Sequence, residues 1–101
     1  KFDLKDYYGA ISDFTNAIKL NPKDTDAYFN RGNAKDELKD YYGAIIDFTK
    51  TLELNPKDIS AYKNRGISKE QIRDLEGACA DWQKASELGD QDASEWVRDD
   101  C

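Results

Sequence analysis

The heptapeptide KDYYGAI stands at residues 5–11 and again, letter for letter, at 39–45. When residues 6–39 are laid over 40–73 without a gap, 20 of the 34 positions are identical. A third, more divergent copy begins at Asp74 and keeps Gly77, Asp81 and an aromatic residue at Trp82. A gapless period of this length indicates a repeat architecture, in which each unit buries its apolar face against its neighbours.

Each unit predicts two helices joined by a short turn. Within residues 7–18, small and apolar residues recur at spacings of three and four, which places them on one face of an α-helix. Asn-Pro at 21–22 and 55–56 ends the preceding helix, because the residue before proline avoids the helical region. Aspartates before the helical runs are predicted N-caps: Asp6, Asp24, Asp40, Asp58 and Asp74. We expect helices near 7–20, 25–38, 41–54, 59–72, 75–88 and 91–100, and no strand.

The composition narrows the range of functions. A chain of 101 residues is one domain at most, and Lys1 at its start suggests that the natural N-terminus has been removed. The net charge of −6, with acidic and basic residues interspersed, argues against a nucleic-acid partner, which would need a basic stripe. The chain also has no apolar run long enough to cross a membrane. Because the chain contains no histidine, Cys/His metal sites and Cys–His nucleophiles are excluded.

Along its whole length the chain resembles tetratricopeptide (TPR) repeats. The marks that carry the resemblance are, in the middle unit, Tyr28, Gly32, Ala44, Phe48, Leu54 and Pro56, and in the next unit Tyr62, Gly66, Ala78, Trp82, Ala85 and Leu88. There are also departures: Arg31 and Arg65 replace the family's usual leucine, Thr51 replaces an alanine, and the third unit has Gly89-Asp90 in place of its proline.

The resemblance implies an all-α fold, a right-handed superhelical stack of antiparallel helix pairs called A and B. It divides the single domain 1–101 into a partial repeat at 1–24 (mainly helix B), full repeats at 25–58 and 59–92, and a capping helix at 93–101. The glycines at 32 and 66 would let helix A approach helix B where Ala44 and Ala78 face it, with Phe48 and Trp82 filling the space beside them.

The two arginine departures predict ion pairs between stacked helices. Arg31 and Arg65 recur at the 34-residue period, and so do Asp13, Asp47 and Asp81 on the B helices. A single charge is usually solvated, whereas a repeated arginine matched by a repeated aspartate is better explained as a ladder of pairs. We expect Arg31 to bridge Asp13 or Asp47, and Arg65 to bridge Asp47 or Asp81.

The TPR resemblance also implies a concave groove, lined by A helices, that holds a peptide or a helical segment of a partner protein. Asn30 and Asn64 are the strongest candidates, because a side-chain amide can both donate to and accept from a peptide backbone. The alternative is that both asparagines are solvated helix surface, but Phe29 and Ile67 beside them would then be exposed without a reason. The predicted groove residues are Asp26, Phe29, Asn30, Asn33, Asp36, Glu37, Lys63, Asn64, Ile67, Glu70, Gln71 and Arg98.

Some TPR domains that bind chaperone C-termini hold the terminal carboxylate with two asparagines and three basic residues from three successive A helices. In this chain Asn33, Asn64 and Arg98 fall at matching places, but Phe29 and Ser94 hold the two lysine places. Acidic residues near the same groove would also repel a carboxylate, which makes this clamp a weak hypothesis.

Residues 91–100 predict a terminal cap. Trp96 follows Tyr62 by 34 residues, so we expect it to pack onto the helix at 75–88. The antiparallel arrangement would bring Cys79 and Cys101 to the same end of the molecule. We expect a cytoplasmic protein, whose reducing environment would keep both cysteines as thiols, with Cys79 a small core residue.

No cofactor or catalytic group is predicted. The chain has no glycine-rich phosphate loop, its carboxylates follow the repeat period, and its Asp-rich turns lack the EF-hand spacing. The second function considered is self-association, end to end or by helix exchange. The segment KFDL before the first heptapeptide would be the tail of an otherwise missing A helix, leaving Tyr7, Ala10 and Phe14 without a partner. Residues 1–20 would then be a surface that another copy could cover.

Overall fold

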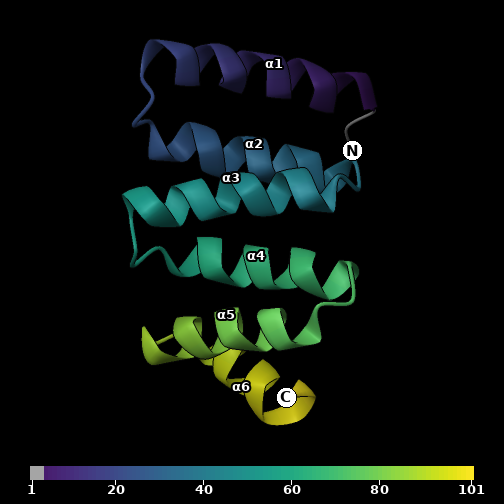
Figure 1. The fold of residues 1–101 in the computed structure, drawn as a ribbon, viewed down its shortest axis with the longest axis vertical. Helices are drawn as coiled ribbons and strands as arrows, with labels where there is room; N and C mark the ends of the chain where they lie inside the picture. Colours follow the sequence, from purple (N-terminus) through teal and green to yellow (C-terminus); the bar gives the residue numbers. More distant parts are fainter. Residues whose placement is uncertain (1–3) are drawn as a thin grey trace.

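The computed structural model describes residues 4–101, so the expected A-helix tail at residues 1–3 lies outside the described residues. Within that range the chain forms six helices and no strand: α1 (Leu4–Leu20), α2 (Thr25–Glu37), α3 (Tyr41–Leu54), α4 (Ile59–Gln71), α5 (Leu75–Glu87) and α6 (Gln91–Asp100). Figure 1 shows them as a stack in which α1 to α5 lie side by side in alternating directions, with α6 packed at an angle against α5. The predicted all-α solenoid is confirmed, and α2 and α4 are A helices while α1, α3 and α5 are B helices.

Aspartate side chains begin five of the helices. Asp24, Asp40, Asp58, Asp74 and Asp90 each accept a hydrogen bond from the backbone N–H three residues later, at 2.9–3.1 Å. This satisfies one of the free N–H groups of each first turn.

The predicted cap at Asp6 is wrong, because α1 already begins at Leu4. Before α3 and α5 the chain leaves the preceding A helix through Lys39 and Arg73, whose φ angles of 64° and 66° break the helix. Lys5, the residue at the equivalent position of the first repeat, is helical.

Small residues of the A helices meet aromatic residues of the B helices in the core. A methyl group added at Gly32 would lie 2.8–3.2 Å from the ring of Phe48, and one added at Gly66 would clash with the indole of Trp82. Ala44, Phe48 and Ala78 are fully buried and Trp82 is 2% exposed. The two glycines therefore set the distance at which helices A and B pack.

Arg31 and Arg65 bind one aspartate each, on the B helix that follows. Arg31 donates two hydrogen bonds of 2.8 Å to Asp47, and Arg65 donates two of 2.8 and 2.6 Å to Asp81. The alternative partner Asp13 is exposed on α1 and makes no ion pair among residues 4–101.

The second contact of each arginine is to a hydroxyl on the B helix that precedes it. Arg31 donates to Thr15 at 3.2 Å and Arg65 to Thr49 at 3.1 Å. Each guanidinium thereby joins three successive helices, and it also lies over the ring of a tyrosine, Tyr28 or Tyr62. Each arginine therefore contacts one carboxylate and one hydroxyl, whereas the prediction named only carboxylates as partners.

The C-terminal helix differs in register from the expected one. α6 spans Gln91–Asp100, as the helical pattern predicted, but it begins two residues before position 93, where the 34-residue period places the start of this helix. α5 is one residue shorter than α3, and the segment 88–90 is one residue shorter than the turn at 55–58. Its buried Ala93 follows the cap Asp90 by three residues, as Ala61 follows Asp58. Trp96 is therefore structurally equivalent to Asn64 of α4, and not to Tyr62. It still packs onto α5, with its ring 5.4 Å from that of Trp82.

Cys79 and Cys101 form a disulfide, so the expectation that both remain thiols is wrong. The antiparallel packing of α5 and α6 brings their Cα atoms to 6.0 Å, which is within the normal range for this bond. The covalent link ties the end of α6 to α5. Disulfides persist mainly in oxidising compartments, and the cytoplasmic location stays a prediction.

Candidate functional site

The side chains predicted to line the groove link neighbouring A helices to one another. The amide of Asn64 on α4 donates to the side-chain oxygen of Asn33 on α2 at 3.0 Å. One turn further along, the hydroxyl of Ser68 donates to Asp36 at 2.8 Å. These two hydrogen bonds hold α2 beside α4, so Asn33, Asp36 and Asn64 shape the A-helix surface before any ligand arrives.

The two apolar groove candidates pack into the core. The ring of Phe29 lies 5.7 Å from that of Phe48, and Ile67 packs against the cluster that contains Ala78 and Trp82. Both side chains are half-buried. The predicted exposure of Phe29 and Ile67 without a partner is therefore wrong, since the protein itself supplies their partners.

Lys63 is held by α6. Its ammonium lies 3.3 Å from Asp90 and 3.4 Å from Asp92, and 5.4 Å from the centre of the Trp96 ring. Its role in the structure is to fix the capping helix against α4, in a network that combines charge and an aromatic face.

Each of the three residues that match the hypothetical carboxylate clamp has a partner within the chain. Arg98 pairs with its neighbour Asp99 at 3.1 Å, and both side chains are largely exposed. The clamp needs a basic residue at the sixth position of this helix, the position that Asn64 holds in α4. Because α6 begins at Gln91, its sixth residue is Trp96 and not Arg98. The asparagines of the clamp, Asn33 and Asn64, bind each other.

Acidic groups dominate the part of the A-helix surface that remains open. Asp26, Glu37 and Glu70 are exposed, as are the polar side chains of Asn30 and Gln71. Burial raises the pKa of the Asp36 carboxyl, while the hydrogen bond from Ser68 opposes that shift. A ligand on this surface would meet negative charge and amide groups.

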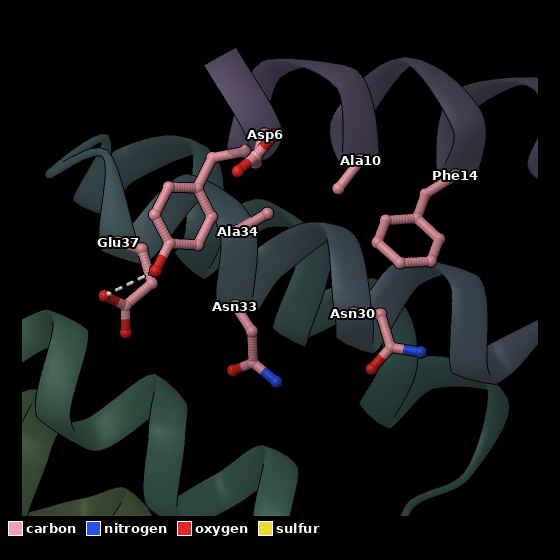
Figure 2. A pocket seen from close by; sticks show the side chains of 8 residues that line it. Asp6, Ala10, Phe14, Asn30, Asn33, Ala34 and Glu37 are labelled. Atoms are coloured by element: carbon pink, nitrogen blue, oxygen red, sulfur yellow. Dashed lines mark hydrogen bonds between the residues drawn. The ribbon is translucent and has the colours of Figure 1, made fainter. Parts of the chain in front are cut away.

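A cavity of about 260 Å³ lies between α1 and α2. In Figure 2, Ala10 and Phe14 point from α1 toward Asn30, Asn33 and Ala34 of α2. At one end of the cavity, the Tyr7 hydroxyl donates to Glu37 at 3.5 Å. A smaller cavity of about 130 Å³ lies near the other end of the stack, lined by Ile67, Glu70, Trp82, Trp96 and Asp100.

Sequence reasoning missed several residues that shape this surface. Ser68 was not considered because Ala34 occupies its place in the preceding repeat. Thr15 and Thr49 recur at the 34-residue period and could have been found by the same comparison that identified the arginines.

Residues 4–101 contain no cluster of three or more His, Cys, Asp or Glu side chains arranged to hold a metal ion. None of the helices described is both long enough and apolar enough to cross a membrane.

Comparisons with known proteins agree with this architecture. A family model described as tetratricopeptide repeat matches residues 25–58, and another described as TPR repeat matches residues 1–38. No curated protein sequence gives a significant match.

Among solved structures, the first TPR of Spaghetti (RPAP3), bound to the HSP90 peptide SRMEEVD, is 27% identical with a TM-score of 0.86. The alignment covers 93% of this chain and 76% of that one. The first TPR domain of human RPAP3 is 28% identical with a TM-score of 0.83, covering 91% and 74%. The Arabidopsis OM64 TPR domain is 31% identical with a TM-score of 0.85, covering 93% and 79%. On the helix pairs, the 34-residue period and these matches, the chain belongs to the tetratricopeptide repeat family.

Proposed function

We propose that this chain is a non-catalytic scaffold that binds a peptide or helical segment of a partner protein on the A-helix surface of α2, α4 and α6. The observation that carries the proposal is the likeness to a TPR domain that was solved with a bound peptide, which extends over 93% of this chain. TPR domains are typically interaction modules, and we infer the same role here rather than an enzymatic one.

The chemistry of the surface supports a partner segment that carries positive charge. Asp26, Glu37 and Glu70 are exposed beside the free amides of Asn30 and Gln71. The predicted groove residues include two cations, and each is paired with an acidic residue: Lys63 with Asp90 and Asp92, and Arg98 with Asp99. A ligand ending in acidic residues would be repelled, whereas Lys or Arg side chains would be attracted.

A display library of random peptides provides the test, with SRMEEVD, the HSP90 peptide bound to the first TPR of Spaghetti, as a fixed probe. We expect the enriched peptides to contain Lys or Arg, and their binding to weaken as salt is added. SRMEEVD should bind more weakly than the selected peptides, because this chain lacks an assembled carboxylate clamp.

Groove variants locate the binding. Asn30→Ala combined with Glu70→Lys should weaken the selected peptides, since both residues are exposed on A helices. Neither side chain makes a hydrogen bond or ion pair with another side chain among residues 4–101. Glu76→Lys on the B helix α5 is the matched control and should leave binding unchanged. If no peptide is enriched, or if the control weakens binding as much as the groove variant, the proposed function is wrong.

A further inference from the structure

The cavity of about 130 Å³ between α4, α5 and α6 differs in chemistry from the equivalent place in the preceding repeat. It is called the tryptophan cavity here, and its lining residues are Ile67, Glu70, Trp82, Trp96 and Asp100. The equivalent residues lie 34 positions earlier for α4 and α5, and 32 positions earlier for α6, which is the spacing between Ala93 and Ala61. They are Asn33, Asp36, Phe48, Asn64 and Ser68. The chain thus contains an internal reference for the tryptophan cavity.

At the reference place, polar side chains of α2 and α4 bind each other. The amide of Asn64 donates to Asn33 at 3.0 Å, and the hydroxyl of Ser68 donates to Asp36 at 2.8 Å. Each acceptor on α2 therefore meets a donor on α4, and the two A helices are joined by complementary groups.

In the tryptophan cavity neither of these pairs is kept. Ile67 and Trp96 stand where the two asparagines bind each other, and Glu70 and Asp100 stand where the aspartate and the serine do. Both carboxylates are exposed, and neither makes a hydrogen bond or ion pair with another side chain among residues 4–101. A second carboxylate thus replaces the serine donor, and a cation is the group that would complement the two negative charges.

Indole rings form the apolar part of the cavity. Trp82 and Trp96 lie edge to face, with ring centres 5.4 Å apart and an angle of 63° between the ring planes. Trp82 is 2% exposed, whereas Trp96 is half-buried. The face of an indole attracts cations more strongly than the other aromatic side chains do.

The chain already holds one ammonium group in this way. Lys63 lies 5.4 Å from the centre of the Trp96 ring, and 3.3 and 3.4 Å from the carboxylates of Asp90 and Asp92. Ile67 follows Lys63 by one turn of α4, so the tryptophan cavity lies beside this network. It offers the same kinds of group, an indole and two carboxylates, but its lining residues include no cation.

We infer that the tryptophan cavity takes a lysine side chain of the partner segment, with the ammonium near Trp96 and the carboxylates of Glu70 and Asp100. This assignment rests on the proposed function, because the cavity lies along the A helices that would bind that segment. Lysine is favoured over arginine, since an ammonium is more compact than a guanidinium and Lys63 shows the arrangement that holds it.

Both tryptophans of the chain line the cavity, so indole N–H signals in NMR spectra of the isotope-labelled chain report on it directly. The probe is the tripeptide acetyl-Ala-Lys-Ala-amide, which should shift both indole signals in a saturable way. The norleucine counterpart has the side-chain methylenes without the charge and should leave both signals in place. The arginine counterpart should bind more weakly. Equal binding of either counterpart would overturn the assignment to lysine.

Neutral variants test the two carboxylates. Glu70→Gln combined with Asp100→Asn should weaken the lysine probe roughly 10-fold or more, which is the usual effect of losing hydrogen bonds between charged groups. Glu76→Gln combined with Glu95→Gln is the matched control: it removes the same charge from exposed residues outside the cavity and should leave binding unchanged. Equal weakening by both pairs would mean general charge attraction and would refute the site.

The lysine site and the proposed function can fail separately. If display peptides bind the A-helix surface but the lysine probe leaves both indole signals unmoved, the assignment of the cavity is wrong and the scaffold function stands. If the lysine probe binds the cavity and no peptide is enriched, the cavity's preference for lysine stands and the scaffold function is wrong.

Discussion

Replacing Arg65 with leucine tests whether its ion pair with Asp81 holds the repeats together. The two side chains are 18% and 5% exposed, and they share two hydrogen bonds of 2.8 and 2.6 Å. After the substitution the Asp81 carboxylate stays buried and loses both bonds. Lys69, at 3.2 Å, remains its one cation.

Breaking a buried pair from one side costs about 3–5 kcal/mol, because it leaves an uncompensated charge. Since Lys69 still offsets part of that charge, we expect Arg65→Leu to lower the free energy of unfolding by about 3 kcal/mol. In a domain of this size that loss corresponds to a fall in melting temperature of roughly 12–24 °C.

The double variant Arg65→Leu with Asp81→Asn separates the ion pair from the bulk of the arginine. It removes the stranded charge, so it should be more stable than Arg65→Leu alone by about 1 kcal/mol or more, although it contains one more substitution. Urea unfolding followed by far-UV circular dichroism gives the free energies for wild type, both single variants and the double variant.

The exposed pair Arg98–Asp99 provides the control. Its side chains are 70% and 62% exposed, and such pairs contribute little to stability, so Arg98→Leu should leave the unfolding curve nearly unchanged. If the effects of Arg65→Leu and Asp81→Asn simply add, the two residues do not act as a pair and the reasoning fails.

Three further predictions concern single features of the stack. Burial raises the pKa of Asp36, so the folded protein keeps the Asp36 proton to a higher pH than the unfolded chain does. Stability therefore falls as pH rises through the raised pKa. Asp36→Asn should stabilise the protein in urea unfolding at neutral pH and lose that advantage at acidic pH. Gly9→Ala should raise the melting temperature, since a methyl group there meets nothing within 4 Å and alanine favours the helix by roughly 0.5–1 kcal/mol, whereas Gly66→Ala should lower it through the clash with the buried indole. Reduction of the Cys79–Cys101 bond, which spans 22 residues, should cost about 3 kcal/mol and speed hydrogen exchange in α6, while the Cys79→Ala and Cys101→Ala double variant should not respond to reductant.

Contacts that recur at the 34-residue period were the ones the sequence could predict. Arg31 and Arg65 with their aspartates, and Gly32 and Gly66 with the facing aromatic rings, each appear twice in the sequence, so a structural role could be inferred without coordinates. The choice of Asp47 over Asp13 as the partner of Arg31 could not be predicted, because sequence spacing does not say whether an arginine reaches the preceding or the following B helix.

Features that occur once were predicted poorly, and α6 shows why. The 34-residue period makes Trp96 equivalent to Tyr62, but α5 and the segment after it are each one residue shorter than their counterparts in the preceding repeat. Together these differences shift every side chain of α6 by two positions. Two residues correspond to about 200° of rotation around a helix of 3.6 residues per turn, so the shift replaces Arg98 by Trp96 at the sixth position of α6. The Cys79–Cys101 disulfide also occurs once in the chain, so comparing the repeats could not reveal it.

The two ends of the stack therefore differ in kind. At the C-terminal end a rotated helix, a disulfide and the Lys63 network cover the last repeat, and the residues that would continue the pattern have been replaced. At the other end α1 keeps Ala10, Asp13 and Phe14, the residues that the next two repeats use to bind an A helix. Ala10, Asp13 and Phe14 match the residues that hold α2 and α4 in the following repeats, so their presence on α1 follows from the 34-residue period of the sequence.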